Sequence, residues 1–386
     1  MKGFFNLSHL SAGFTTVLVG YTSSVVIVIQ AATASGANPA QIESWLLTLG
    51  VVMGLTSILY SWFYKTPIVT AWSTPAAVML AASAGQYSLP VVIGAFMFSG
   101  ALFTLTGMLA PLTRALSKIP VPLGTAMLGA ILLPFCAKAF TPLTDTPALF
   151  ALLFTSYLLA KHFVPRYTML VLLLVSLGSA LALGSFQHAD LALRIATPIW
   201  VMPEFDWLAI LNLALPLYLI TMLSQNLPGI AMLKSYQYDA PIKPILVGTG
   251  LATLMSAPFG GFSVNLAAIS AAICMNEDVD QDKAQRYRAV LWAGGFYLLA
   301  GIFAALVVNL FLALPKPISA MLAGLALLGT LMMCLQSAFK IDEHREPALL
   351  TFVITLSGAT LFGMSATLIG LVIGLAYLRL TTRPRP

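Results

Sequence analysis

The chain has 386 residues, of which 59% are hydrophobic and 8% are charged, and its formal net charge is +6. Soluble domains carry roughly 25% charged residues, so this composition excludes a water-exposed globular protein. The basic residues are scattered between apolar blocks, which argues against nucleic acid as a partner. We therefore expect the whole chain to lie in a lipid bilayer. No cleavable signal peptide is evident, so the first apolar block is expected to be a span.

Apolar blocks recur along the chain, and blocks of about 17 to 25 residues are long enough to cross a bilayer core of roughly 30 Å. We expect helices near residues 12–32, 42–63, 91–110, 121–138, 146–161, 166–186, 207–224, 241–257, 286–311, 317–338, 346–362 and 364–380. Two further apolar segments, Thr74–Gln86 and Val264–Met275, are too short to cross alone. Each follows a stretch rich in Pro, Gly or β-branched residues, and we count each segment with its extended lead-in as one crossing.

This assignment gives an all-α polytopic membrane protein with fourteen crossings and with both termini on one side. On that side fall all of the 19 Lys and Arg residues except Lys138, Arg194 and Lys316. Because cytoplasmic loops carry the excess of Lys and Arg, we expect both termini in the cytoplasm. The bias disappears if either short segment fails to cross, which supports two discontinuous crossings, the third and the tenth.

The two halves of the chain resemble each other. Residues 66–78 align without gaps with residues 257–269, and residues 119–130 resemble residues 314–324 at nearly the same spacing. The aligned pairs include Pro67 with Pro258, Ala76 with Ala267, and Ala77 with Ala268. Seven crossings per half is an odd number, so the second copy must be inverted. Such a repeat, with one discontinuous crossing per half, is typical of secondary transporters with a midplane site; the alternative is that the breaks merely kink helices.

The residues that could carry chemistry in the membrane are few. Acidic residues and histidines, including His188 and Asp190, fall in loops or at helix ends, so neither a catalytic triad nor a histidine metal site is indicated. The three cysteines have no CxxC spacing, which indicates neither a metal site nor a disulfide framework. The sequence thus predicts no enzyme, no metal and no cofactor.

Uncharged residues, several of them polar, lie beside both breaks. They are Trp72, Ser73 and Thr74 at the first break, and Gly260, Gly261, Phe262, Ser263 and Asn265 at the second. Both short segments begin here, so their free N–H groups and positive dipole ends can form an anion site. The two glycines would let the backbone approach a ligand. Asn265 is expected in the first turn of the second segment, where its amide can cap that turn and reach the ligand.

Two further groups of residues are candidates for the same site. Trp72 and Phe262, with Tyr21 in the first helix, can stack on an aromatic ring, or can simply pack between helices. Gln225 and Asn226 can donate to a carboxylate or to unwound backbone, although Gln225 can also bridge helices. The Leu-Pro-Gly that follows Asn226 predicts a break in the helix there.

Three stretches carry a resemblance to a known family. They are Leu10–Tyr21 (LSAGFTTVLVGY), Pro67–Ala77 with its Ala-Trp-Ser-Thr-Pro, and Pro258–Ala268 (PFGGFSVNLAA). With these motifs the chain resembles the benzoate/proton symporter (BenE) family over essentially its full length. The resemblance implies a bacterial inner-membrane protein that imports benzoate or a similar small aromatic carboxylate together with a proton.

The family is similar in architecture to nucleobase and sulfate permeases. This implies a seven-plus-seven inverted repeat, with a core domain (residues 1–113 and 206–311) and a gate domain (residues 114–205 and 312–386) that move by an elevator-like or rocking motion. A homodimer is also suggested.

The chain departs from one feature of that architecture. Nucleobase permeases have membrane-embedded carboxylates in crossings eight and ten, where this chain has Gln225 or Asn226 and Asn265. The neutral residues fit an anionic ligand, which a buried carboxylate would repel. They leave two proton routes open, one with the carboxylate itself and one through a tyrosine or water path.

Other functions stay open at this point. They are a carrier of another anion or of a nucleobase, and an anion channel or non-transporting receptor. No G-x-x-x-x-G-K-[ST] motif is present, so a self-contained ATP-driven pump is not expected.

Overall fold

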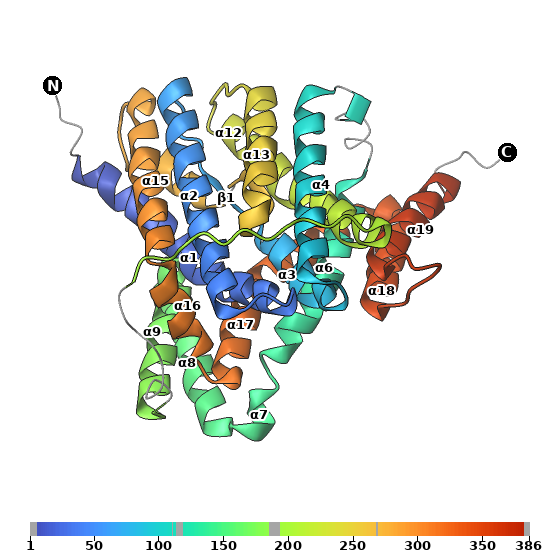
Figure 1. The fold of residues 1–386 in the computed structure, drawn as a ribbon, viewed down its shortest axis with the longest axis horizontal. Coiled ribbons are helices and arrows are strands. Elements are labelled where there is room, and N and C mark those ends of the chain that lie inside the picture. The colour runs from blue at the N-terminus through green and yellow to red at the C-terminus, as the bar shows by residue number, and fades with distance from the viewer. Residues whose placement is uncertain (1–5, 110, 113–118, 185–193, 268, 382–386) are drawn as a thin grey trace.

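The computed structural model describes residues 6–109, 111–112, 119–184, 194–267 and 269–381. Within those ranges, eight helices are long and apolar enough to cross a membrane, or nine when one bent pair is counted as a single span. The chain is therefore a mostly helical, polytopic membrane protein (Figure 1). Several predicted features lie outside the described residues. They are the domain boundary between residues 113 and 114, Ala268, His188, Asp190, and the basic residues Lys2, Arg114, Lys118, Arg383 and Arg385.

The first half of the chain contains two groups of elements. The first group is α1 (Leu7–Ala34), α2 (Pro39–Tyr64), β1 (Thr70–Trp72), α3 (Thr74–Ser83), η1 (Ala84–Gln86) and α4 (Leu89–Met108). The second group is α6 (Val121–Lys138), α7 (Pro142–Asp145), α8 (Pro147–Phe163), η2 (Pro165–Tyr167) and α9 (Thr168–Ala182).

The second half begins with one continuous helical stretch, made of α10 (Trp207–Ala209), η3 (Ile210–Ala214), α11 (Leu215–Thr221), η4 (Met222–Asn226) and α12 (Leu227–Ser235). It continues with α13 (Ile242–Ser256), η5 (Ala257–Phe259), β2 (Val264–Leu266), α14 (Ile269–Met275), η6 (Lys283–Gln285), α15 (Tyr287–Ile302) and α16 (Ala304–Leu312). It ends with α17 (Lys316–Ala338), η7 (Asp342–His344), α18 (Arg345–Ser357) and α19 (Ala366–Thr381).

The most extensive helix packing joins the two halves of the chain. α2 packs against α15, α4 against α13, and α6 against α17. Small residues let the first of these pairs approach closely, as is common between helices in membranes. A Cβ atom at Gly50 would lie 2.6 Å from the Gly301 Cα, and one at Gly54 would lie 2.7 Å from the Gly294 carbonyl oxygen. These contacts hold α2 close against α15, and α2 also contacts both strands.

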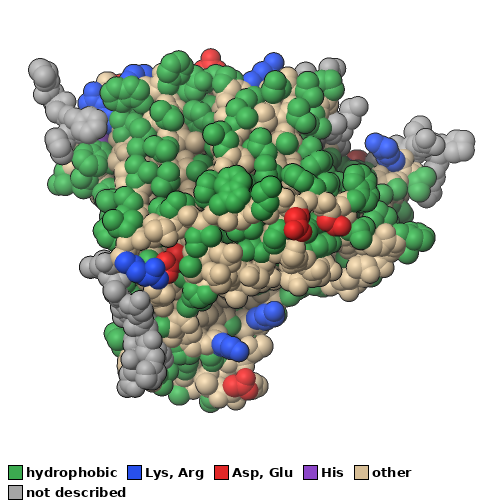
Figure 2. Space-filling model, viewed as in Figure 1, with side chains coloured by type: hydrophobic (Ala, Val, Ile, Leu, Met, Phe, Trp, Pro, Cys, Tyr) green, Lys and Arg blue, Asp and Glu red, His purple; other side chains and the backbone are tan. Residues whose placement is uncertain are grey.

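The outer surface of these helices is apolar. Leu59 and Phe63 of α2 and Met255 of α13 are all more than half exposed. Figure 2 shows hydrophobic side chains over the upper part of this face, with Lys and Arg at its upper edge. A surface of this kind fits contact with lipid tails, where burial inside the protein is not needed.

Two predicted features of the helices are wrong. The helix expected at residues 286–311 is divided into α15 and α16, which meet at an angle of 61° directly after the close contact at Gly301. The break expected after Asn226 is absent from the described structure, because η4 is a π-helical turn that leads straight into α12. The missing N–H of Pro228 and its clash with the preceding turn are accommodated by the wider turn. Pro216 follows the π-helical η3 in the same way.

Candidate functional site

Strands β1 and β2 pair antiparallel and place the extended lead-ins of the two short helices, α3 and α14, side by side. The paired residues are Thr70 with Leu266, Ala71 with Asn265, and Trp72 with Val264. α3 follows β1 and α14 follows β2, so this pairing directs the two short helices away from the strands in opposite directions. The first and last of these pairs, Thr70–Leu266 and Trp72–Val264, are two residues apart along each strand, a distance of about 7 Å. The amino ends of α3 and α14 therefore flank one small region.

Neighbouring helices hold both strands by equivalent hydrogen bonds. The Thr70 amide donates to Ser57 Oγ of α2 at 3.0 Å, and the Val264 amide donates to Thr253 Oγ1 of α13 at 3.0 Å. An antiparallel strand pair has a local two-fold axis, which here passes between Ala71 and Asn265. Rotation about this axis exchanges Thr70 with Val264. The two strands are thus anchored in the same way, each by a hydroxyl from the helix before it.

The register of the strands differs from the gapless sequence alignment. Thr70 and Val264 are 194 residues apart, whereas the aligned Pro67 and Pro258 are 191 apart. The additional length in the second lead-in follows η5, where Gly260 has a φ of +93° and Ser263 a φ of +44°. These left-handed conformations turn the chain before β2 begins. The sequence alignment of the two lead-ins is therefore wrong by three residues at the strands.

Tyr21 and Trp72 lie together, as neighbours contributed by α1 and β1. Their ring centroids are 5.1 Å apart with an interplanar angle of 55°. The Trp72 indole N–H donates to Ser24 Oγ at 2.9 Å, which fixes the orientation of the indole ring. The Tyr21 hydroxyl oxygen is buried and has no hydrogen-bond partner among the described residues. It is therefore a donor that remains available to a ligand.

Ser73 and Thr74 form the start of α3. Ser73 is fully buried, and its Oγ accepts a hydrogen bond from the Ala76 amide at 3.2 Å, which makes it the N-cap. Thr74 opens the helix and is half-buried. Because the Ser73 hydroxyl oxygen is used within the cap, it satisfies one of the free N–H groups that would otherwise face the site.

Asn265 of β2 and Ser263, directly before β2, carry unpaired polar atoms. Both side chains are completely buried. Asn265 Nδ2 donates to the Ser263 carbonyl at 2.9 Å, but Asn265 Oδ1 and Ser263 Oγ have no partner among the described residues. The prediction that Asn265 lies in the first turn of the short helix is wrong, since it lies in β2 and α14 begins at Ile269. Buried polar atoms without partners are costly. The Ser263 hydroxyl can donate to an anion, whereas Asn265 Oδ1 only accepts and would need a donor such as a protonated carboxyl group.

Asn226 has a different role from its neighbour Gln225. Asn226 is buried, and its Oδ1 accepts a hydrogen bond from the Leu266 amide at 3.0 Å, while its Nδ2 donates to Met222 Sδ at 3.1 Å. It therefore links the π-helical turn η4 to β2. Gln225 is half-buried, and no hydrogen bond fixes its amide in the described structure.

Gly260, Gly261 and Phe262 pack against the helices that surround the second lead-in. A Cβ at Gly260 would lie 1.8 Å from the Trp45 ring of α2, and a Cβ at Gly261 would lie 2.1 Å from Ser256 Oγ of α13. The fully buried Phe262 lies with Trp45 at 5.9 Å and with Phe96 at 5.5 Å between ring centroids. Among the described residues it makes no ring contact with Tyr21 or Trp72, so the structure does not bring the three predicted aromatic residues together.

Sequence reasoning missed two polar residues of this region. Ser24 orients the Trp72 indole, and it lies one turn after Tyr21 on α1. Thr221 is fully buried and lies one turn before Gln225, and its hydroxyl has no partner among the described residues. Helical spacing from Tyr21 and Gln225 could have identified both, because positions three and four residues apart share a helix face.

The described part of the membrane region contains one buried acid, Glu43 at the start of α2. Its Oε1 accepts a hydrogen bond from the Arg194 guanidinium at 2.5 Å, so its charge is paired. The region around β1 and β2 therefore presents hydroxyls, amides and helix amino ends. Such a set of groups stabilises a negative charge without a fixed positive side chain.

Comparison with known proteins gives close relatives in sequence. Residues 3–380 match the family described as benzoate membrane transport protein, BenE. The inner membrane protein YdcO of Escherichia coli is 40% identical over 365 residues, which cover 95% of this chain and 93% of that protein. The benzoate membrane transport protein of Acinetobacter baylyi is 35% identical over 385 residues, which cover 100% of this chain and 98% of that protein.

Solved structures share the fold at low sequence identity. SLC26A9 matches with a TM-score of 0.67 and 14% identity, over 98% of this chain and 66% of that chain. The transmembrane domain of the cyanobacterial bicarbonate transporter BicA matches with a TM-score of 0.62 and 17% identity, over 98% of this chain and 97% of that chain. The structures support the fold, and the sequence relatives are named as membrane and transport proteins and not as enzymes. By the full-length sequence match, the chain belongs to the benzoate membrane transport protein family, BenE.

Proposed function

We propose that this protein carries benzoate, or a similar small aromatic carboxylate, across the inner membrane by symport with a proton. The observation that carries the proposal is the pairing of β1 with β2, which sets the amino ends of two short helices around buried, unpaired polar atoms. The Tyr21 and Ser263 hydroxyls are donors that a carboxylate can use. The family membership and the name of the Acinetobacter baylyi relative support benzoate as the substrate.

The aromatic ring of the substrate would lie against Tyr21 and Trp72. Their rings already contact each other at a tilted angle, and an aromatic ligand between or beside them would gain roughly 0.5 to 1.5 kcal/mol beyond area burial. We propose that Asn265 supplies the second hydrogen of its Nδ2 to the carboxylate, since only one is used by the Ser263 carbonyl. Thr74 and Gln225 are the remaining half-buried polar residues of the proposed site.

We propose that the protein has the seven-plus-seven inverted repeat and moves a core domain against a gate domain. The symmetric packing of α2 with α15 and of α4 with α13 supports this proposal, because exchange of the two halves converts one pair into the other. The equivalent anchoring of β1 by Ser57 and of β2 by Thr253 supports it as well. In this arrangement both termini are cytoplasmic, and the homodimer stays a prediction.

Uptake of labelled benzoate into proteoliposomes tests the proposed function. An acid-outside gradient is imposed, and protein-free liposomes of the same lipid are the control, because neutral benzoic acid crosses lipid unaided. Concentrative, saturable uptake above that control supports a proton-coupled carrier. Uptake that equilibrates without accumulation would indicate a channel, and saturable binding without flux would indicate a receptor. Competition by a nucleobase or an inorganic anion, with no effect of benzoate, would overturn the choice of substrate.

A further inference from the structure

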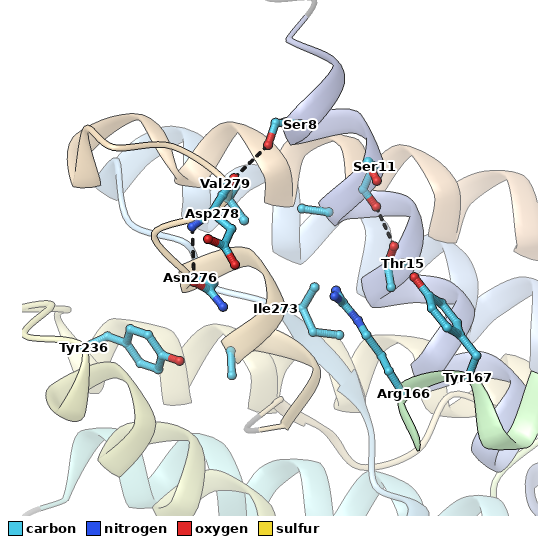
Figure 3. A pocket seen from close by; sticks show the side chains of 12 residues that line it. Ser8, Ser11, Thr15, Arg166, Tyr167, Tyr236, Ile273, Asn276, Asp278 and Val279 are labelled. Carbon is cyan, nitrogen blue, oxygen red and sulfur yellow. Dashed lines mark hydrogen bonds between the residues drawn. The ribbon is translucent and has the colours of Figure 1, made fainter. Parts of the chain in front are cut away.

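A cavity of about 390 Å³ lies at the end of α14, away from the paired strands. Four segments line it: the start of α1, η2, the turn after α12, and the end of α14 with its following loop (Figure 3). Its volume is within the usual range of small-molecule sites, roughly 300 to 1,000 Å³. On α1, Thr15 of the cavity lies six residues before Tyr21, which is about 9 Å along the helix axis. The cavity thus lies a short distance from the proposed substrate site.

The cavity contains one cation that is free to bind an anion. Arg166 of η2 has no ion pair and no hydrogen bond among the described residues, and Figure 3 shows its side chain extending toward α1 and α14. The nearby Arg286 is used differently: it is buried and donates to the carbonyls of Met275 and Asp280. A guanidinium binds a carboxylate through two parallel hydrogen bonds, so Arg166 is suited to this ligand class.

The rest of the lining combines apolar and polar groups. Ala12, Ala272 and Ile273 offer an apolar wall, and Thr15 and Tyr167 offer hydroxyl groups. An aromatic carboxylate needs both kinds of surface, one for its ring and one for its charge. A small inorganic anion would use only the polar part.

Asp278 is the acidic residue of the cavity lining. Its carbonyl accepts from Ser8 Oγ at 3.1 Å, and its amide donates to Asn276 Oδ1 at 3.2 Å. Its carboxylate makes no ion pair with Arg166 among the described contacts, so it leaves the guanidinium free and weakens the hold on an anion by repulsion. Weak binding suits a site from which a ligand must depart.

We propose that this cavity is a second site for the aromatic carboxylate, where Arg166 holds the substrate on its way between the central site and the cytoplasm. The inference rests on the proposed function and on the proposed cytoplasmic location of this end. Arg166 lies in the proposed gate domain, whereas α1 and α14 lie in the proposed core domain. The carboxylate would therefore bind at the boundary between the two moving parts.

Benzoate–benzoate exchange tests this site separately on each face of the membrane. Inside-out and right-side-out vesicles are compared, with saturating benzoate on the opposite face. For Arg166→Gln we expect the half-saturating benzoate concentration to rise roughly tenfold or more at the cytoplasmic face, since hydrogen bonds to charged groups are strong. We expect little change at the periplasmic face. For Arg166→Lys, the half-saturating concentration at the cytoplasmic face should lie between those of the wild-type protein and Arg166→Gln. Asp278→Asn should lower the half-saturating concentration at that face.

Lys161→Gln is the matched control, since it removes an exposed cation at the same end of the molecule but outside the cavity. Equal shifts in Arg166→Gln and Lys161→Gln would show a general effect of surface charge and would overturn the inference. A half-saturating benzoate concentration equal to that of the wild-type protein at both faces of Arg166→Gln would overturn it as well. Failure of the wild-type protein to exchange benzoate would instead refute the proposed function, so the two failures are distinguishable.

Discussion

The two short helices with their paired strands, β1–α3 and β2–α14, which we propose as the two discontinuous crossings, differ in how completely their polar groups are satisfied. In the first crossing, Ser73 caps α3 and the Trp72 indole is bonded to Ser24. In the second, Ser263 Oγ and Asn265 Oδ1 are buried without partners in the described structure. The first also has the longer helix, with ten residues in α3 against seven in α14.

The difference indicates that the β1–α3 and β2–α14 segments have different roles in the proposed site. A crossing whose polar groups are satisfied is stable without a ligand, whereas buried unpaired groups gain partners only when a ligand arrives. We infer that Trp72 of β1, together with Tyr21 of α1, orients the site. The Tyr21 hydroxyl is one donor to the substrate, and Ser263 and Asn265 supply the other polar contacts. Variants can test each side of this comparison.

The largest expected effect is loss of the folded state in Gly260→Ala. The new Cβ would overlap the Trp45 ring, and alanine is strained at a φ of +93°. We expect a loss of roughly 3 kcal/mol or more in stability from the combined strain and overpacking. Thermal unfolding in detergent measures it. Gly85→Ala, just after α3, is the matched control, because a Cβ there would meet its nearest atom at 3.4 Å. An equal loss of stability in Gly85→Ala would contradict the view that overlap with Trp45 and backbone strain make Gly260 necessary.

The next largest effect is expected for Asn226→Ala. This change leaves the buried Leu266 amide without its acceptor and frees β2 from η4. A buried, unsatisfied donor costs about 1 to 3 kcal/mol, so both thermal stability and benzoate transport should fall. Gln225→Ala, at the adjacent position, should keep the stability of the wild-type protein. If the two variants unfold at the same temperature, Asn226 does not hold β2 in the way described.

The smallest effect is expected for Ser73→Ala. The variant loses the N-cap of α3, which costs about 1 kcal/mol of stability. Because the Ser73 hydroxyl is used in that cap, benzoate affinity should change less than stability does. Calorimetric titration of the purified variant measures the affinity. An affinity loss as large as that of Asn265→Ala would remove the distinction between the two crossings.

The sequence predicted two short helices that each follow an extended lead-in, because length and Pro or Gly content mark them locally; that both cross the membrane stays a prediction. It did not predict the register of the strands. That register depends on left-handed turns at Gly260 and Ser263 and on hydrogen bonds from Thr253 and Asn226, which come from distant parts of the chain. For this reason the sequence alone predicts a helix at Asn265, which lies in β2.

The helices show the same limit. Pro228 in an apolar segment favours a break, but the π-helical turn before it accommodates the ring, and the helix continues. The bend between α15 and α16 lies directly after the close contact of Gly301 with Gly50, a contact that no local pattern reveals. Proximity in sequence places Phe262 beside the other candidate residues, whereas its packing with Trp45 and Phe96 is a property of the tertiary fold.

Benzoate binding to Asn265 variants tests the central claim most directly. Asn265→Ala should weaken binding by roughly 1 to 3 kcal/mol if the amide bonds to the buried carboxylate. Asn265→Asp has almost the same shape but adds a negative charge that repels the ligand, so its affinity should fall further, and the loss should grow as pH rises and more of the aspartate ionises. Wild-type affinity in a folded Asn265→Asp protein at neutral and higher pH would contradict an anion site at the paired strands.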